Sequence, residues 1–343
     1  MTGATLSVAG PPLVLGGLLN WVLDDVWGTL FDILAALTGV EMLGYPFMQR
    51  AYLAAVCIAV IGPLVGSFLV HREMAMIGDT LAHSAFAGVA VGLFVNATFA
   101  MAVPPLLTAL VVAVVAAVLV QLLVDRVGTY TDTSLAVVLT GAFAVGSVLV
   151  TATDGGIAVG INAYLFGSLA TVTRDSVGIL LAMTLLVSAV VAVAYRPLLY
   201  ATFDEVGARA AGLHVGRYNL LLVVLTAVVV VAAMQIMGVI LVAAMLVIPV
   251  ATAGSMRGFR RSVGAAILAG LVATVSGATL SYVYDVAAGG SIVLVAIAVY
   301  AAVGLARPVR STVATAVRSR LAARTADGRA VEADGGDGPG ERD

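Results

Sequence analysis

Asp79 and His83 stand four residues apart in an otherwise apolar stretch of the chain. In an α-helix, residues i and i+4 lie on one face with their Cβ atoms about 5–6 Å apart. Carboxylate oxygen and imidazole nitrogen suit zinc, manganese and iron(II), so this pair could hold one small cation. The structural alternative is that Asp79 caps the start of a helix while His83 hydrogen-bonds a neighbouring carbonyl. Ionisable groups at membrane depth are costly and generally mark a pathway or a binding site, which favours the metal hypothesis.

The composition is that of an integral membrane protein. Apolar residues make up 62% of the 343 residues and charged residues 10%, and the mean hydropathy is +1.12. Soluble domains carry about 25% charged residues. Only helices and closed barrels satisfy their backbone in lipid, and the long runs of Leu, Val, Ala, Ile and Gly lack the alternation of a barrel strand. We therefore expect an all-α, polytopic helical bundle with about eight to ten spans.

The apolar runs divide the chain into three parts. Residues 1–45 carry interrupting acids and are expected to be an external or interfacial segment, and residues 46–306 form the membrane domain. Residues 307–343 are expected to hold a basic juxtamembrane helix and an acidic, disordered cytoplasmic tail. A shorter apolar segment near 157–171 could re-enter the membrane without crossing it. The expected spans are 47–70, 80–96, 101–124, 134–152, 176–195, 218–235, 237–256, 262–284 and 291–306.

Arginine placement predicts the orientation, and the basic residues limit the chemistry. Arg126, Arg209 and Arg257 fall in loops that can share one side of the membrane, and positive loops mark the cytoplasmic side. The same reasoning puts the C-terminus in the cytoplasm. All 17 basic residues are arginine, so the chain has no lysine-dependent phosphate-binding loop. If transport by this chain uses ATP, a partner must supply the ATPase.

An ordered set of local motifs extends from residue 46 to residue 306. Together these motifs resemble the permease subunits of zinc, manganese and iron ABC importers, which are distantly like the cobalamin-type importer permeases. The pieces are Phe47-Met48-Gln49-Arg50-Ala51, Gly66-Ser67-Phe68-Leu69-Val70, Gly78-Asp79-Thr80-Leu81-Ala82-His83-Ser84, Asp132-Thr133-Ser134-Leu135-Ala136, Leu165-Phe166-Gly167-Ser168, Tyr195-Arg196-Pro197-Leu198, Phe203-Asp204, Ala208-Arg209-Ala210-Ala211-Gly212-Leu213, the run from Gly238 to Pro249, and Ser291-Ile292-Val293-Leu294.

The resemblance implies a multi-pass permease of the cell membrane that has no enzyme activity of its own. It implies a permease homodimer in the lipid bilayer with cytoplasmic ATP-binding subunits and an extracellular metal-binding protein, and no nucleic acid. A divalent metal ion is then the cargo, with no permanently bound cofactor. Asp79 and His83 would face the translocation path.

The resemblance also assigns a role to the polar segment 200–217, which corresponds to a short cytoplasmic helix that docks onto the ATPase. The residues expected to couple the chain to ATP hydrolysis there are Asp204, Glu205, Arg209 and Gly212. Val206 stands where the family usually has an acid. Two other functions stay open from the residues alone. One is a secondary, ion-coupled cation transporter, and the other is an intramembrane hydrolase using Asp79 and Asp285.

Overall fold

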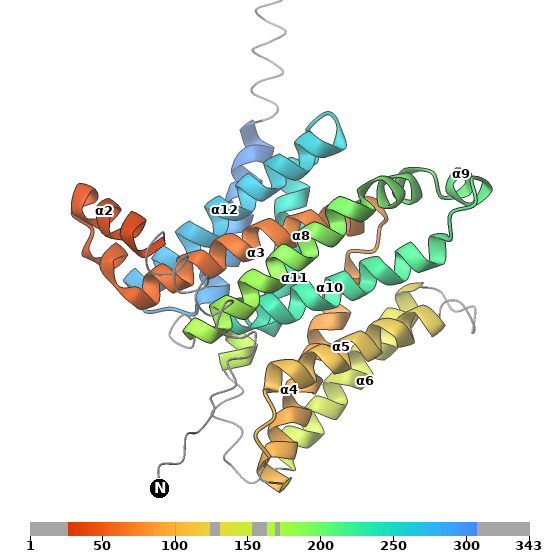
Figure 1. The fold of residues 1–343 in the computed structure, drawn as a ribbon, viewed down its shortest axis with the longest axis horizontal. Coiled ribbons are helices and arrows are strands. Elements are labelled where there is room, and N and C mark those ends of the chain that lie inside the picture. The colour runs from red at the N-terminus through yellow and green to blue at the C-terminus, as the bar shows by residue number, and fades with distance from the viewer. Residues whose placement is uncertain (1–26, 100, 124–130, 153–162, 169–171, 307–343) are drawn as a thin grey trace, which may run out of the picture. The chain divides into compact units, whose positions relative to one another are not determined.

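The computed structural model describes residues 27–99, 101–123, 131–152, 163–168 and 172–306. Within these ranges the regular structure is helical, and eight helices are long and apolar enough to cross a membrane. The all-α polytopic bundle expected from the sequence is confirmed (Figure 1). The elements are α2 (Thr29–Thr38), η2 (Glu41–Gly44), α3 (Pro46–His71), α4 (Met76–Phe99), α5 (Pro105–Leu122), α6 (Thr131–Thr151), α8 (Arg174–Phe203), α9 (Glu205–Ala210), α10 (Val215–Met237), α11 (Val239–Ala253), α12 (Phe259–Tyr284) and a last helix, Ala288–Ala306.

Two helices differ from the spans expected from hydropathy. The expected span 237–256 is the shorter helix α11, whose 15 residues extend about 22 Å at 1.5 Å per residue. The hydrocarbon core is about 30 Å thick, so α11 alone is too short to cross it. Helix α8 was expected to end at residue 195 but continues through Pro197 to Phe203. Both differences arise because hydropathy reports apolar length and does not report where the backbone breaks.

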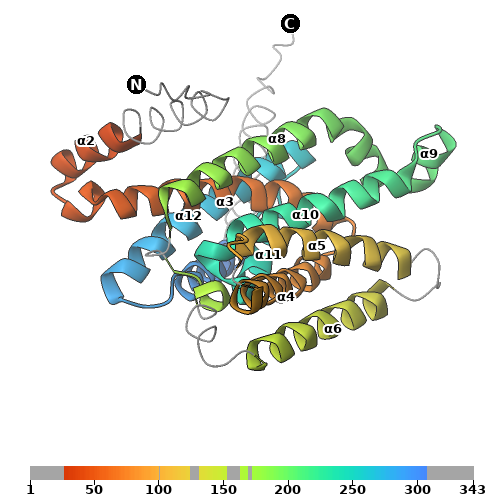
Figure 2. The same ribbon diagram turned by 60° about the horizontal axis from the view of Figure 1, so that its bottom comes forward.

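Helix α3 is the central element of the first compact unit of the chain, Met1–Ile297. It packs against α8, α10, α11 and α12, and Figures 1 and 2 show it running beside α8 and α12. Of its most apolar window, 78% is buried, whereas only 22% of the α6 window is buried. The exposed Val and Leu side chains of α5, α6 and α8 therefore face outward, as lipid-facing residues do. The second unit, Ala298–Asp343, is described only over residues 298–306.

Small residues let the helices beside α3 and α4 approach closely. A Cβ atom built on Gly66 would lie 2.0 Å from the Leu246 carbonyl oxygen of α11, and one on Gly88 would lie 2.5 Å from the Ala109 Cα of α5. Contacts this short leave no room for a side chain, so glycine is required at both positions. Glycines four apart (Gly62 with Gly66, Gly88 with Gly92) thus perform the packing role that small residues have in membrane helices.

Two glycines far apart in the sequence interlock where α10 meets α11. Gly238 has φ +79° and separates the two helices, and a Cβ built on it would lie 2.2 Å from the Leu165 carbonyl oxygen. Gly167 has φ +74°, and its Cβ would lie 2.0 Å from the Ile236 carbonyl oxygen. The motif containing Leu165 and Gly167 therefore packs against the start of the motif that begins at Gly238. Residues 157–162 and 169–171 of the segment expected to re-enter the membrane lie outside the described residues.

The segment before α3 contacts the first two turns of that helix. The Trp27 indole donates a hydrogen bond to the Gln49 carbonyl (2.8 Å), and the Gln49 amide donates to the Asp32 carboxylate (2.9 Å). Phe31 stacks on Tyr52 with ring centroids 5.5 Å apart. Residues 1–26 and 307–343 lie outside the described residues, so the expected interfacial N-terminal segment and the expected basic helix and acidic tail stay predictions.

Candidate functional site

The structure brings Asp79 and His83 together in the first two turns of α4. His83 Nε2 lies 3.7 Å from Asp79 Oδ1, and the two side chains are 23% and 36% exposed. Two ligands bonded to one metal at about 2.1 Å in tetrahedral geometry stand about 3.4 Å apart. The observed separation exceeds this by about 0.3 Å, so a small side-chain adjustment would let both atoms hold one ion.

The structural alternative for this pair does not match the geometry. Helix α4 begins at Met76, so Asp79 lies inside the first turn and is not the capping residue. A carboxylate there is favoured by the helix dipole. His83 Nδ1 is buried and has no hydrogen-bond partner among the described residues. Buried polar atoms are nearly always paired, so Nδ1, the ring nitrogen that does not face Asp79, is left for a partner outside the described residues.

The residues around the pair are apolar or already hydrogen-bonded. The His83 ring meets the Phe143 ring of α6 edge-on, with centroids 5.3 Å apart. The Thr80 hydroxyl contacts the carbonyls of Met76 (3.1 Å) and Leu135 (3.4 Å). No group of three or more His, Cys, Asp or Glu side chains that could hold a metal occurs within the described ranges. Asp79 and His83 would therefore make only an incomplete metal site, in which water, backbone oxygen or another chain would have to fill the remaining positions.

The segment expected to dock onto an ATPase contains the six-residue helix α9, capped at both ends. The Asp204 carboxylate accepts a hydrogen bond from the Gly207 N–H (2.8 Å). At the other end, Gly212 adopts φ +83°, and the Leu213 N–H donates to the Ala208 carbonyl (3.0 Å). This pattern is the Schellman motif, in which a left-handed glycine closes a helix. So short a helix is not stable by itself, and the caps and the buried Ala208 hold it in place.

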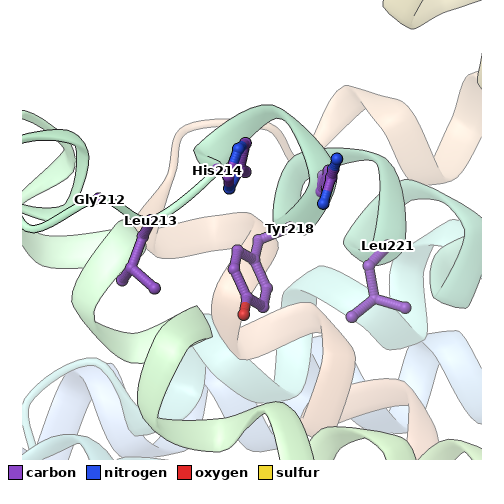
Figure 3. A pocket seen from close by; sticks show the side chains of 6 residues that line it. Gly212, Leu213, His214, Tyr218 and Leu221 are labelled. Atoms are coloured by element: carbon purple, nitrogen blue, oxygen red, sulfur yellow. The ribbon is translucent and has the colours of Figure 1, made fainter.

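The outer face of α9 is exposed. Glu205 and Arg209 form an ion pair one helical turn apart, and both remain half or more exposed. Val206 is 80% exposed, although it is apolar. Beside α9, a cavity of about 390 Å³ is bounded by the turn into α10 and by the first turns of that helix (Figure 3). Its lining residues are Gly212, Leu213, His214, Arg217, Tyr218 and Leu221.

Arg72, directly after the end of α3, makes polar contacts with two other helices that the sequence did not predict. Its Nε donates to the Thr202 hydroxyl of α8 (2.9 Å), and its Nη1 donates to the Asn219 side-chain oxygen of α10. These partners are 130 and 147 residues away in sequence, so no local pattern pairs them. The available signal was an arginine directly after an apolar span, between a histidine and a glutamate.

The fold is that of a polytopic membrane protein with one polar pair on an inner helix and a short capped helix at one end. Residues 44–306 match the ABC 3 transport family, and the chain belongs to this family. The resemblance to metal ABC importer permeases found in the sequence is thereby confirmed.

The relatives of this chain include membrane subunits named for metal transport. The manganese transport system membrane protein MntC of Halalkalibacterium halodurans is 34% identical over 265 residues, covering 76% of this chain and 87% of that protein. A probable metal transport system membrane protein of Treponema pallidum is 33% identical, covering 75% and 94%. The solved structure of PsaBC from Streptococcus pneumoniae in complex with Fab is 27% identical, with a TM-score of 0.69, covering 77% and 92%.

Proposed function

We propose that this chain is the permease subunit of an ABC importer that carries a divalent transition-metal ion into the cell, driven by ATP hydrolysis in partner subunits. The observation that carries the proposal is the Asp79–His83 pair, with Asp79 Oδ1 and His83 Nε2 3.7 Å apart. Membership of the ABC 3 transport family supports the transporter class. Together these support our proposal that Asp79 and His83 are ligands along the translocation path.

Manganese is the first cargo to test, with zinc and iron(II) as competitors. Several relatives are named as manganese transporters, and an oxygen–nitrogen ligand pair is compatible with all three ions. Two ligands from one chain bind weakly, which suits a carrier that must release its cargo. In a permease homodimer, a second copy would bring a second Asp79–His83 pair and raise the number of ligands to four.

The distribution of arginine and of exposed side chains suggests where each proposed partner would bind. The loops that carry arginine, including the α9 segment, are assigned to the cytoplasm by the positive-inside rule. There α9 would dock onto the ATP-binding subunit through Glu205 and Arg209, which are exposed. The extracellular metal-binding protein would approach the opposite end, where a cavity of about 600 Å³ is lined by Phe47, Asp285 and their neighbours.

The intramembrane hydrolase is the weaker alternative because its two aspartates are far apart. Asp285 shares a cavity with Phe47, at the start of α3. Asp79 follows the end of the same helix, whose 26 residues extend about 39 Å. Two carboxylates at opposite ends of the bundle cannot act on one bond.

Metal uptake into sealed vesicles tests the proposal. Vesicles with the permease and its ATPase subunit, with the ATPase and ATP enclosed and the metal-binding protein outside, should take up Mn²⁺, and vesicles containing the permease alone should not. Asp79→Ala and His83→Ala should each abolish uptake while the ATPase still binds. Asp175→Ala is the control, because this exposed acid also lies in the first turn of a helix. Uptake by the permease alone, driven by an ion gradient, would instead establish a secondary transporter.

A further inference from the structure

Arg72 joins three helices at the end of the bundle that carries α9. It follows the last residue of α3, and its guanidinium donates hydrogen bonds to Thr202 on α8 and to Asn219 on α10. Thr202 lies two residues before the Asp204 cap of α9, and Asn219 lies in the second turn of the helix that follows α9. Arg72 is therefore hydrogen-bonded to both helices that flank α9 in the sequence, α8 before it and α10 after it.

The backbone after Arg72 leads directly into the helix that carries the metal pair. Glu73 has φ +59°, and the Met74 N–H donates to the Leu69 carbonyl (2.9 Å), which closes α3. The Ile77 N–H then donates to the Met74 carbonyl (3.1 Å), and α4 has begun. This turn is short and hydrogen-bonded on both sides, so we expect a displacement of Arg72 to shift the first turn of α4. Asp79 lies in that turn.

The charge of Arg72 is only partly satisfied. Its Nη2 is buried and has no hydrogen-bond partner among the described residues. Burial lowers the pKa of the guanidinium, and the nearby Glu205 carboxylate partly offsets this. Glu205 is at present paired with Arg209 on the exposed side of α9. A movement of α9 would thus change how strongly Glu205 acts on Arg72.

We propose that Arg72 is the positioning residue that couples movement of the docking helix α9 to the Asp79–His83 pair. This inference rests on the proposed transport function. When a partner ATPase moves α9, the ends of α8 and α10 move with it, and Arg72 carries that movement into the turn before α4. Arg72 touches neither the cargo nor the nucleotide. Its role is to link two sites through hydrogen bonds to Thr202 and Asn219.

The test is the amount of Mn²⁺ transported per ATP hydrolysed, measured in vesicles with the assembled permease–ATPase complex and the metal-binding protein. Arg72→Met keeps the apolar stem and removes the donors. Couplings between sites typically amount to about 5- to 150-fold, so the ratio should fall at least about fivefold while ATP hydrolysis continues. Arg50→Met is the matched control, because Arg50 lies at the other end of α3 and, among the described residues, donates to the Pro46 carbonyl of its own helix. An unchanged ratio would overturn the proposal, as would equal losses of transport and hydrolysis.

A double-mutant cycle keeps the proposal testable if Arg72→Met assembles poorly. Asn219→Leu and Thr202→Val each remove one acceptor and should each lower the ratio. Arg72→Lys then takes the place of Arg72→Met, and it should also lower the transport-to-hydrolysis ratio. The effects of residues that act through one shared interaction are not additive. The double variant Arg72→Lys, Asn219→Leu should therefore lower the ratio no further than the stronger of its two single variants. Additive losses would refute the link. If the wild-type complex fails to move Mn²⁺, Zn²⁺ or Fe²⁺ with ATP, the transport proposal itself fails. Normal wild-type transport with a normal ratio in the variants refutes only the role of Arg72.

Discussion

Replacing Gly212 by alanine should loosen α9, the helix that we propose docks onto the ATPase, without creating a steric clash. Gly212 closes α9 with φ +83°, and a Cβ atom built there meets nothing within 4 Å. Only backbone strain then opposes the change, and the left-handed conformation costs an L-residue about 1–2 kcal/mol. An energy of that size changes a population ratio by a factor of about 5–30.

Amide hydrogen exchange across residues 205–213 measures this effect directly. The Leu213 N–H, which donates to the Ala208 carbonyl, should lose protection by about 5- to 30-fold in Gly212→Ala. Apparent affinity for the ATPase should fall by no more than the same factor, since only the population of the competent state changes. Gly216→Ala is the matched control, because Gly216 lies in α10 and a Cβ there also meets open space. Equal protection in wild type and Gly212→Ala, or equal losses in both variants, would show that Gly212 does not hold α9 closed.

Three further changes test the metal pair, the helix packing and the other cap of α9. Asp79→Asn should weaken Mn²⁺ binding at equilibrium by at least about 10- to 100-fold, since even outer-shell partners of metals contribute that much. The control Asp175→Asn should bind Mn²⁺ as the wild type does. Equal affinities in wild type and Asp79→Asn would show that Asp79 is not a ligand. Gly66→Ala places a Cβ 2.0 Å from a carbonyl oxygen of α11 and should destabilise the bundle by about 1–3 kcal/mol, which would lower its unfolding temperature in detergent. The control Gly141→Ala, with open space around it, should leave that temperature unchanged. Equal unfolding temperatures for the two variants would contradict the close approach at Gly66. Asp204→Ala removes the N-terminal cap of α9 and should cost that helix about 1 kcal/mol, so hydrogen exchange there should quicken, and wild-type protection would rule the cap out.

Most of the fold could be predicted because apolar length is a direct signal for membrane helices. The span expected at 47–70 is Pro46–His71, and that expected at 262–284 is Phe259–Tyr284. Helix ends were harder to predict. Pro197 suggests an end to α8, since the residue before proline disfavours the helical conformation, yet the helix continues to Phe203. A single glycine, Gly238, divides what reads as two consecutive spans and leaves α11 short.

The candidate site was only partly predictable, because some of its contacts join residues that are far apart in the sequence. The Asp79–His83 pairing follows from helical spacing alone, and the structure has it. The short polar helix α9 was also expected, although its six-residue length and its two caps depend on backbone angles. Contacts between distant segments, such as His83 with Phe143 or Arg72 with Asn219, could not be predicted. They are set by how whole helices pack, and a single sequence contains no local signal for that.

The proposed orientation has a consequence for how the metal pair would act. Asp79 and His83 lie three and seven residues after the start of α4, which is about 5 and 10 Å along the helix. If the α9 end faces the cytoplasm, an entering ion meets this pair late in its passage, close to the exit. Two ligands from one chain hold an ion weakly, and the turn held by Arg72 lies immediately before them. A weak site beside a movable turn is suited to releasing cargo in step with the ATPase, while tight capture is left to the extracellular partner.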